Sequence, residues 1–207
     1  MTPVPEVDPP ETDEARPAEG DPQPQSYQTP AVRPYRLADG EGRYRGQDIL
    51  VTHPDQIYRA ILAVVEAEAP LHLTDLLTRV AGMWGKKAGS RIARRITSCL
   101  EQSQSHGQVV CRGKFIWSPS PQITARSRAG TGIPAERICP EEYREAVLTI
   151  LRSGQAFSRP QLTNEARSLF GFNRTGSILE DQIGEAIDTL LREGVLGESS
   201  AGVVLRT

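Results

Sequence analysis

The chain of 207 residues is long enough for one or two small domains, and its 24 basic and 26 acidic residues leave a net charge of −2. No stretch approaches the roughly 20 apolar residues that a membrane-spanning helix needs, and the start lacks the basic and then apolar pattern of a secretory signal. The three cysteines (Cys99, Cys111, Cys139) are odd in number and form no Cys-x-x-Cys pair, which argues against a disulfide framework and a zinc site. We therefore expect a soluble, cytoplasmic protein without a metal or a cofactor.

The charges are distributed unevenly along the chain. Residues 1–30 carry seven acids and one base, and residues 1–34 hold nine of the 16 prolines, so burial cannot offset the entropy of ordering this stretch. Residues 79–128 carry ten bases and one acid, whereas residues 139–207 carry seven bases and ten acids. We predict a disordered acidic tail over residues 1–45, a basic domain over 46–118, a linker over 119–137 and an acidic domain over 138–207.

Helical spacing and turn signals predict the start of the first domain. A helix begins at His53-Pro54, with proline in its first turn, and its apolar residues recur at helical spacing until Ala69-Pro70. A short extended segment, residues 71–73, then precedes a second helix that Thr74 or Asp75 caps.

A third helix and a hairpin complete this domain. The helix follows a glycine-bounded turn, with Ser90 as its N-cap, and two strands within residues 108–117 flank a turn at Arg112-Gly113. Phe115 and Trp117 alternate onto one strand face and are expected in the core rather than in a stacking platform for bases. Helix, short strand, two helices and a hairpin is the order of a winged helix, whose third helix enters a groove of DNA.

The third helix carries its bases on one side. A turn of 100° per residue places Arg91, Arg94 and Arg95 on a face apart from the apolar residues. Such a face either presents guanidinium groups to phosphates or is simply solvated surface. The basic residues that we predict to bind DNA lie on this helix, on the turn before it and at the tip of the wing: Lys86, Lys87, Arg91, Arg94, Arg95, Arg112 and Lys114.

The second domain follows a similar plan. Residues 138–142 begin a helix with proline and acids in its first turn. Ser158 can cap the next helix, which Gly171 ends. Gly176-Ser177 starts the longest helix, with Ile178 among its inward residues, and a closing hairpin follows.

The two domains repeat each other. Gly89-Ser90 and Gly176-Ser177 are 87 residues apart, as are Gly107 and Gly194. The bases are not repeated, since the positions of Arg91, Arg94 and Arg95 are occupied in the second copy by Ile178, Asp181 and Gln182. We therefore expect a mainly α fold with small β-hairpins, built as tandem winged-helix (helix-turn-helix-like) domains of which only the first suits phosphate.

Several motifs, each weak alone, occur in a specific order. They are residues 64–72 (VVEAEAPLH), 79–81 (RVA), 84–85 (WG), 89–92 (GSRI), 113–117 (GKFIW), 138–142 (ICPEE) and 170–176 (FGFNRTG). In this combination, over about residues 52–196, the chain resembles the bacterial family catalogued as domain of unknown function 3320, found near the C-terminus of very large superfamily I helicase-like proteins. The resemblance implies nucleic-acid work beside a helicase motor and, often, a predicted nuclease. This chain has neither, so it is a fragment, a separately supplied partner of such a motor, or a free-standing relative.

No catalytic motif is recognisable. The phosphate-binding loop G-x-x-x-x-G-K-[ST] is absent, because Gly85-Lys86 is followed by Lys87 and no glycine stands five positions earlier. The three histidines, His53, His72 and His106, lack metal-ligand spacing, and His72 is expected to be buried and bonded to a backbone carbonyl. We expect no enzymatic activity and no small-molecule substrate.

The sequence therefore predicts a non-catalytic accessory module that binds duplex DNA and has no contact with membranes. The alternative is an adaptor that docks a helicase-like or nuclease protein through the acidic domain or the tail, without direct contact with DNA. Arginine side chains bind phosphate and guanine alike, so these basic residues predict no preference for a DNA sequence.

Overall fold

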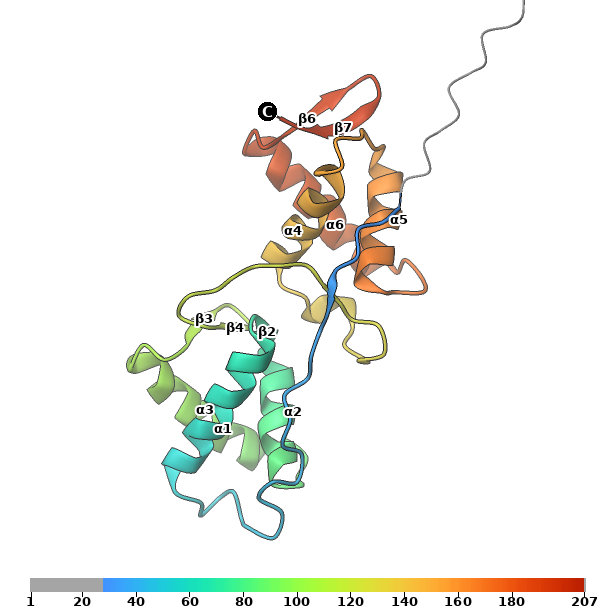
Figure 1. Cartoon of the computed structure of the whole chain (residues 1–207). Coiled ribbons are helices and arrows are strands. Elements are labelled where there is room, and N and C mark those ends of the chain that lie inside the picture. The colour runs from blue at the N-terminus through green and yellow to red at the C-terminus, as the bar shows by residue number, and fades with distance from the viewer. Residues whose placement is uncertain (1–27, 207) are drawn as a thin grey trace, which may run out of the picture.

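The computed structural model describes residues 28–206, and in them the chain forms six α-helices with three small sheets (Figure 1). The helices are α1 (Pro54–Glu68), α2 (Leu73–Met83), α3 (Ser90–Ser105), α4 (Pro140–Leu151), α5 (Arg159–Phe170) and α6 (Ser177–Arg192). The prediction of a mainly α fold with small β elements is therefore confirmed. Helices α1–α3 enclose one apolar core and α4–α6 enclose another, and we call these parts the first and the second unit.

The strands are short and lie at the edges of the two units. They are β1 (Arg33–Pro34), β2 (Leu71–His72), β3 (Val110–Arg112), β4 (Phe115–Trp117), β5 (Arg126–Ser127), β6 (Leu196–Ser199) and β7 (Gly202–Leu205). In the first unit the antiparallel sheet has the order β2-β4-β3, and in the second unit β6 pairs antiparallel with β7. Strands β1 and β5 pair in parallel where the two units meet, and the 3₁₀ turn η1 (Ala135–Arg137) precedes α4.

The start of α2 differs from the prediction. The helix begins at Leu73, and its cap is the His72 ring, whose Nδ1 accepts a hydrogen bond from the Thr74 N–H at 3.2 Å. Asp75, one of the two expected caps, is buried instead. His72 is only partly buried, and among the described residues it donates no hydrogen bond to a backbone carbonyl, contrary to the prediction. Desolvation lowers the pKa of His72, which favours the neutral ring that can accept.

Removal of this cap has a measurable cost. Replacing His72 by alanine is expected to lower the free energy of unfolding by about 1 kcal/mol, because an orphan helix N–H loses its acceptor. Urea unfolding at a pH above 7, where the ring is neutral, measures the loss. The His72→Asn variant keeps a side-chain acceptor and should recover most of the stability; an asparagine variant as unstable as the alanine variant would contradict the capping role.

The third helix and the hairpin are each shifted by one residue from the prediction. Gly89 is the N-cap of α3 and Ser90 its first helical residue, with no side-chain cap bond. In the hairpin, Arg112 pairs with Phe115, so the turn consists of Gly113 and Lys114. The shift leaves Trp117 buried in the core, as expected, and Phe115 only partly buried with its ring edge against His72.

The termini of α5 were predicted correctly. Ser158 accepts from the Gln161 N–H while the Gln161 side chain accepts from the Ser158 N–H, which forms a complete capping box. At the other end Gly171 has φ +78°, and an added Cβ would lie 2.8 Å from the Ala129 Cβ. The helix therefore ends at a position that only glycine fits.

The inward face of α6 contains one error. Ile178 was expected inside but is 48 % exposed, whereas Leu179 is 3 % exposed. Leu179 lies four residues before Ile183 and shares its side of the helix, while Ile178 is turned away from it. An exposed aliphatic side chain therefore marks the first turn of α6.

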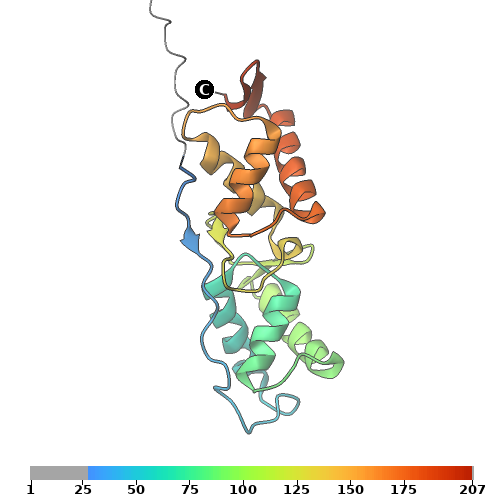
Figure 2. The same ribbon diagram turned by 90° about the vertical axis from the view of Figure 1, so that its right-hand side faces the viewer.

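Two helices of equal length lie at the predicted repeat positions. Helices α3 and α6 each span 16 residues and begin 87 residues apart, each after a glycine N-cap. Gly107 and Gly194 follow the two helices with φ +69° and +73°. Turning the molecule shows α3 and α6 on the same side (Figure 2).

Part of the predicted disordered tail packs against the two units. Residues 28–41, which we call the strap, run along both units, and within it Tyr35 is 6 % exposed (Figure 1). The Tyr35 hydroxyl donates to Glu68 Oε2 at 3.0 Å, and the Ala38 N–H donates to Glu68 Oε1 at 2.8 Å. The acidic, proline-rich composition ends near residue 30, so the strap can bury side chains. Residues 1–27 of the predicted tail lie outside the described residues.

The predicted linker contains a buried ionic cluster. The Arg126 guanidinium donates to the carbonyls of Glu68 and Pro70, both at 2.9 Å, and to Glu142 Oε2 at 3.0 Å. Arg128 is 4 % exposed and donates to both oxygens of the fully buried Glu142 at 2.5 and 2.8 Å. Residues 126–128 therefore fasten the end of α1 to the start of α4, where the sequence predicted only a linker.

None of the helices within residues 28–206 has the length and apolar character required to cross a membrane.

Candidate nucleic-acid interface

The turn between α2 and α3 is held rigidly and presents two lysines. Trp84 is 1 % exposed, and its Nε1 donates to Thr52 Oγ1 at 3.3 Å. The Lys86 N–H bonds back to the Ala81 carbonyl at 3.1 Å. The side chains of Lys86 and Lys87 are exposed. They lie just before the N-terminus of α3, where the helix dipole adds to the attraction for an anion.

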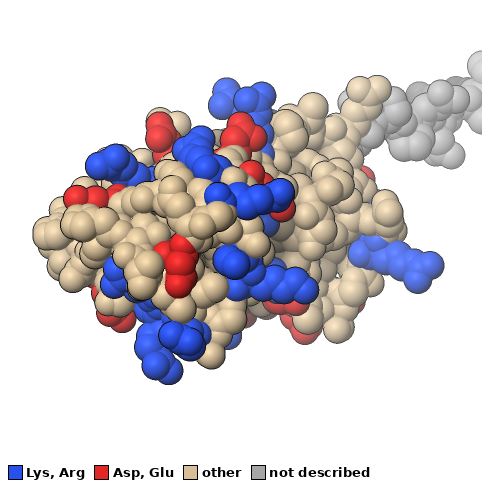
Figure 3. Space-filling view, turned by 90° about the horizontal axis from the view of Figure 1, so that it is seen from below, with Lys and Arg blue, Asp and Glu red and all other residues tan. Residues whose placement is uncertain are grey.

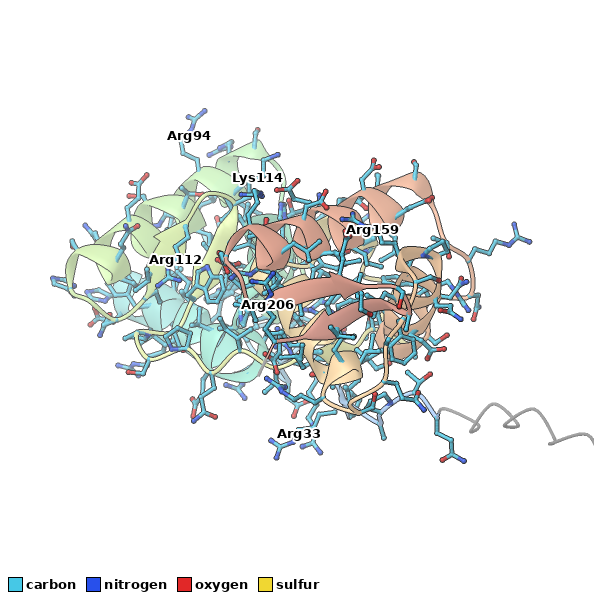
Figure 4. All side chains as sticks on the ribbon, turned by 90° about the horizontal axis from the view of Figure 1, so that it is seen from above. Arg33, Arg94, Arg112, Lys114, Arg159 and Arg206 are labelled. Carbon is cyan, nitrogen blue, oxygen red and sulfur yellow. The ribbon has the colours of Figure 1, made fainter. Side chains whose placement is uncertain are left out.

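Two of the three predicted arginines of α3 point into solvent. The buried residues Ile96, Cys99 and Leu100 fix the inward side of the helix. Arg91 and Arg94 lie on the opposite side and are exposed. Figure 4 shows Arg94 and Lys114 on one side of the molecule and Arg33 on the other.

Arg95 is a correction to the predicted site. Its Nη2 donates to the Thr52 carbonyl at 3.1 Å, the residue is only partly exposed, and its buried Nε has no partner among the described residues. Four residues correspond to 40° on a helix, so Arg95 lies beside Cys99 at the edge of the buried stripe. It braces α3 against the loop before α1 and is removed from the candidate interface.

The hairpin contributes the remaining two predicted cations. Arg112 and Lys114 are exposed, and the Arg112 guanidinium lies 5.0 Å from the centre of the Trp117 ring. The Lys114 carbonyl accepts from the Leu73 N–H at 2.8 Å, which fixes the turn against α2. We call the exposed cations of these elements the basic surface: Lys86, Lys87, Arg91, Arg94, Arg112 and Lys114.

Two further cations were missed by the sequence analysis. The Gly42 and Tyr44 N–H groups donate to the carbonyls of Gly82 and Met83 at 2.9 and 2.7 Å, which brings residues 42–45 against the end of α2. Arg43 and Arg45 are exposed there, and the Arg45 Nε lies 3.5 Å from where a Cβ on Gly85 would be. Only the alternation of glycine and arginine in residues 40–46 hinted at this loop.

Acids and bases alternate over this part of the surface. Seen from the end of the molecule formed by the first unit, Lys and Arg side chains are spread over the surface with Asp and Glu side chains between them (Figure 3). Among the described residues, no residue of the basic surface forms an ion pair. In the second unit, by contrast, surface arginines are paired with neighbouring carboxylates: Arg144, Arg152, Arg159 and Arg192.

The described residues form no metal-binding cluster and no disulfide. Within residues 28–206, no group of three or more His, Cys, Asp and Glu side chains could hold a metal ion. The three cysteines are free thiols, and burial raises the pKa of Cys139 to about 12, which keeps it protonated and unreactive.

Comparison with known proteins gives one family. The model described as Protein of unknown function (DUF3320) matches residues 48–94, which span α1, β2, α2 and the first turn of α3. No curated protein matches the chain. The matched residues include four members of the basic surface, Lys86, Lys87, Arg91 and Arg94. The resemblance predicted from the motifs is confirmed over this stretch, and its extension toward residue 196 stays a prediction. Residues 48–94 of the chain are therefore similar to the DUF3320 family of proteins of unknown function.

Proposed function

We propose that this chain is a non-catalytic accessory module that binds duplex DNA through the basic surface. The observation that carries the proposal is that six exposed cations gather around α3 without an acidic partner among the described residues. Exposed guanidinium and ammonium groups without ion pairs are free to replace the counterions of a phosphate backbone.

The arrangement of elements supports the mode of binding. The order α1-β2-α2-α3-β3-β4, with the sheet β2-β4-β3, agrees with a winged helix, so α3 is the proposed recognition helix and the β3-β4 hairpin the wing. The matching lengths of α3 and α6 support a tandem of two such domains, over residues 46–118 and 138–207. We place the protein in the cytoplasm, as a component of a helicase or nuclease system.

A salt titration tests the binding. Fluorescence anisotropy on labelled duplex DNA is expected to show that log affinity falls with log salt at a slope of about −4.5 to −5.5, because five or six phosphates are contacted at about −0.9 each. Absence of binding at about 50 mM salt would overturn the proposal.

The lysines offer a second measurement in the same experiment. The chain contains three lysines, Lys86, Lys87 and Lys114, and all of them belong to the basic surface. Acetylation followed by mass spectrometry should show protection of these amines when DNA is bound. Equal acetylation with and without DNA would contradict contact through this surface even if the chain bound DNA.

A second candidate function is supported by the second unit. Helix α6 exposes Ile178 and Asp181 at the positions that correspond to Arg91 and Arg94 of α3, and the exposed Glu180 lies beside them in the sequence. Such a surface repels phosphate and suits a protein, so the alternative is an adaptor for a helicase-like or nuclease partner. Recovery of a motor protein in a pull-down that survives nuclease treatment, together with absence of DNA binding, would favour the adaptor.

A further inference from the structure

A groove with apolar and basic walls lies beside the basic surface. It has a volume of about 580 Å³ and is formed by the strap and α2. Its walls combine apolar side chains with the two lysines that precede α3: Leu37, Leu77, Met83, Ala88, Lys86 and Lys87. Leu37 is 42 % exposed, so the groove has an open apolar edge. Arg79 also lines it but is held by Glu68 at 3.2 Å, and Glu41 is its one unpaired acid among the described residues.

We propose that the acidic segment 6–14 of this same chain docks in the groove against Lys86 and Lys87 and shields the basic surface in cis. Residues 6–14 lie outside the described residues; their sequence holds five acids, no base and one valine, Val7, among prolines. Carboxylates would pair with the lysines, while valine and proline would cover the apolar wall.

The length of the chain permits this contact. The described part begins at residue 28 beside α5, where the Thr29 hydroxyl donates to Glu165. Nine residues separate residue 28 from Leu37 in the groove, a span of at most about 32 Å, and fourteen residues separate residue 14 from residue 28, which can span about 50 Å. Segment 6–14 therefore reaches the groove. Tethering gives an effective concentration on the order of millimolar, so a weak contact is sufficient.

Charge directs the segment to the first unit. The Thr29–Glu165 contact, which we call the anchor, places an acid beside the start of the strap. Residues 139–207 carry ten acids against seven basic residues, so the second unit repels the acidic segment. A basic groove closer to the anchor is lined by Arg33, Arg36 and Arg126. Its apolar lining is limited to Pro34 and Ala67, so it offers less to valine and proline than the groove at Lys86.

Crosslinking of the full chain tests the docking. A water-soluble carbodiimide joins a carboxylate and a primary amine in contact as an amide, and the chain offers three lysines and its N-terminal amine. In the monomer fraction, mass spectrometry should find residues 6–14 joined to Lys86 or Lys87, and the linkage should decrease with salt. Linkage to Lys114 alone, or no linkage of this segment, would overturn the proposal.

Two matched double variants distinguish docking of segment 6–14 from a general effect of the acidic charge. Glu11→Gln with Asp13→Asn and Glu19→Gln with Asp21→Asn remove the same two groups at the same spacing, inside and outside the segment. The first pair should reduce the crosslink several-fold and the second pair should leave it nearly unchanged. Equal effects of the two pairs would overturn the docking.

The regulatory consequence rests on the proposed function. The Glu11→Gln/Asp13→Asn variant should bind duplex DNA about 3- to 10-fold more tightly than the wild type at about 50 mM salt. The affinity of the Glu19→Gln/Asp21→Asn variant should differ from that of the wild type by less than about twofold. The crosslink does not depend on DNA. A crosslink without DNA binding would overturn only the proposed function, whereas DNA binding without a crosslink would overturn only the docking.

Discussion

Replacing Glu142 by alanine is expected to lower the free energy of unfolding by about 3–5 kcal/mol at neutral pH. Glu142 is fully buried and accepts hydrogen bonds from Arg126 and Arg128, which have side-chain exposures of 13 % and 1 %. Without the carboxylate, two guanidinium groups remain in a poorly solvated junction with their charge uncompensated. Urea unfolding followed by circular dichroism measures the loss.

The ion pairs of Glu142 with Arg126 and Arg128 make the stability of the protein depend on pH. Burial by itself would raise the pKa of Glu142, but the hydrogen bonds and charges of Arg128 and Arg126 outweigh it and hold the pKa below its ordinary value. A lowered pKa in the folded state stabilises the protein above the unfolded pKa of about 4.3 and loses this contribution as the pH falls through the folded value. The stability difference between the wild type and Glu142→Gln should therefore be constant above about pH 5 and shrink below it.

A surface carboxylate on the same helix provides the control. Glu145 pairs with Arg152 at 2.6 Å, but the Arg152 side chain is 57 % exposed, so Glu145→Ala should cost about 1 kcal/mol or less. If Glu142→Ala lowered the free energy of unfolding no more than Glu145→Ala, the ion pairs of Glu142 with Arg126 and Arg128 would not hold the two units together.

The second large effect concerns binding. Replacing Arg91 and Arg94 together by alanine is expected to weaken the binding of duplex DNA about 10- to 100-fold at about 50 mM salt and to flatten the salt slope by about 2. Both side chains are exposed on the outward side of α3, so folding should be unaffected. Anisotropy titrations at several salt concentrations measure both quantities.

Two controls make this result specific. Arg33→Ala with Arg36→Ala removes the same charge from the strap, and Figure 4 shows Arg33 on the side away from Arg94. This pair should change affinity less than about threefold. Arg95→Ala should reduce stability, because Arg95 is bonded to Thr52, and leave the slope unchanged. Equal losses of affinity in the two double variants would contradict binding through α3.

The elements that the sequence predicted best are those with local causes. Ser158 and Gly171 delimit α5 correctly, because a capping box and a glycine end act within a few residues. The helical spacing of apolar residues gave the order of helices for the same reason. The cap of α2 was missed because His72 caps through a ring nitrogen, and serine, threonine and aspartate are the usual caps.

The candidate site was predicted in part. The cations on α3 and on the turn before it are exposed, as helical phase predicted, and Lys114 is exposed on the hairpin. Arg112 is exposed too, but it ends β3 and lies over the Trp117 ring instead of forming the turn. Arg95 was misassigned because it lies at the edge of the buried side of α3, where a side chain can either extend into solvent or bond to a neighbouring carbonyl. The loop before α1 brings the Thr52 carbonyl within hydrogen-bond distance of Arg95, and helical spacing does not predict this contact. Arg43 and Arg45 were missed because their loop reaches α2 only through long-range backbone bonds.

The sequence by itself determined the helices, the repeat of 87 residues and the restriction of basic charge to the first copy, because periodicity, turn residues and charge are properties of short stretches. Tertiary structure alone decided the roles of Tyr35, Arg126 and Arg128, which the sequence assigned to a tail and a linker. Their partners Glu68 and Glu142 lie 33 and 14 to 16 residues away. Burial of a charge depends on such distant partners, and local composition does not encode them.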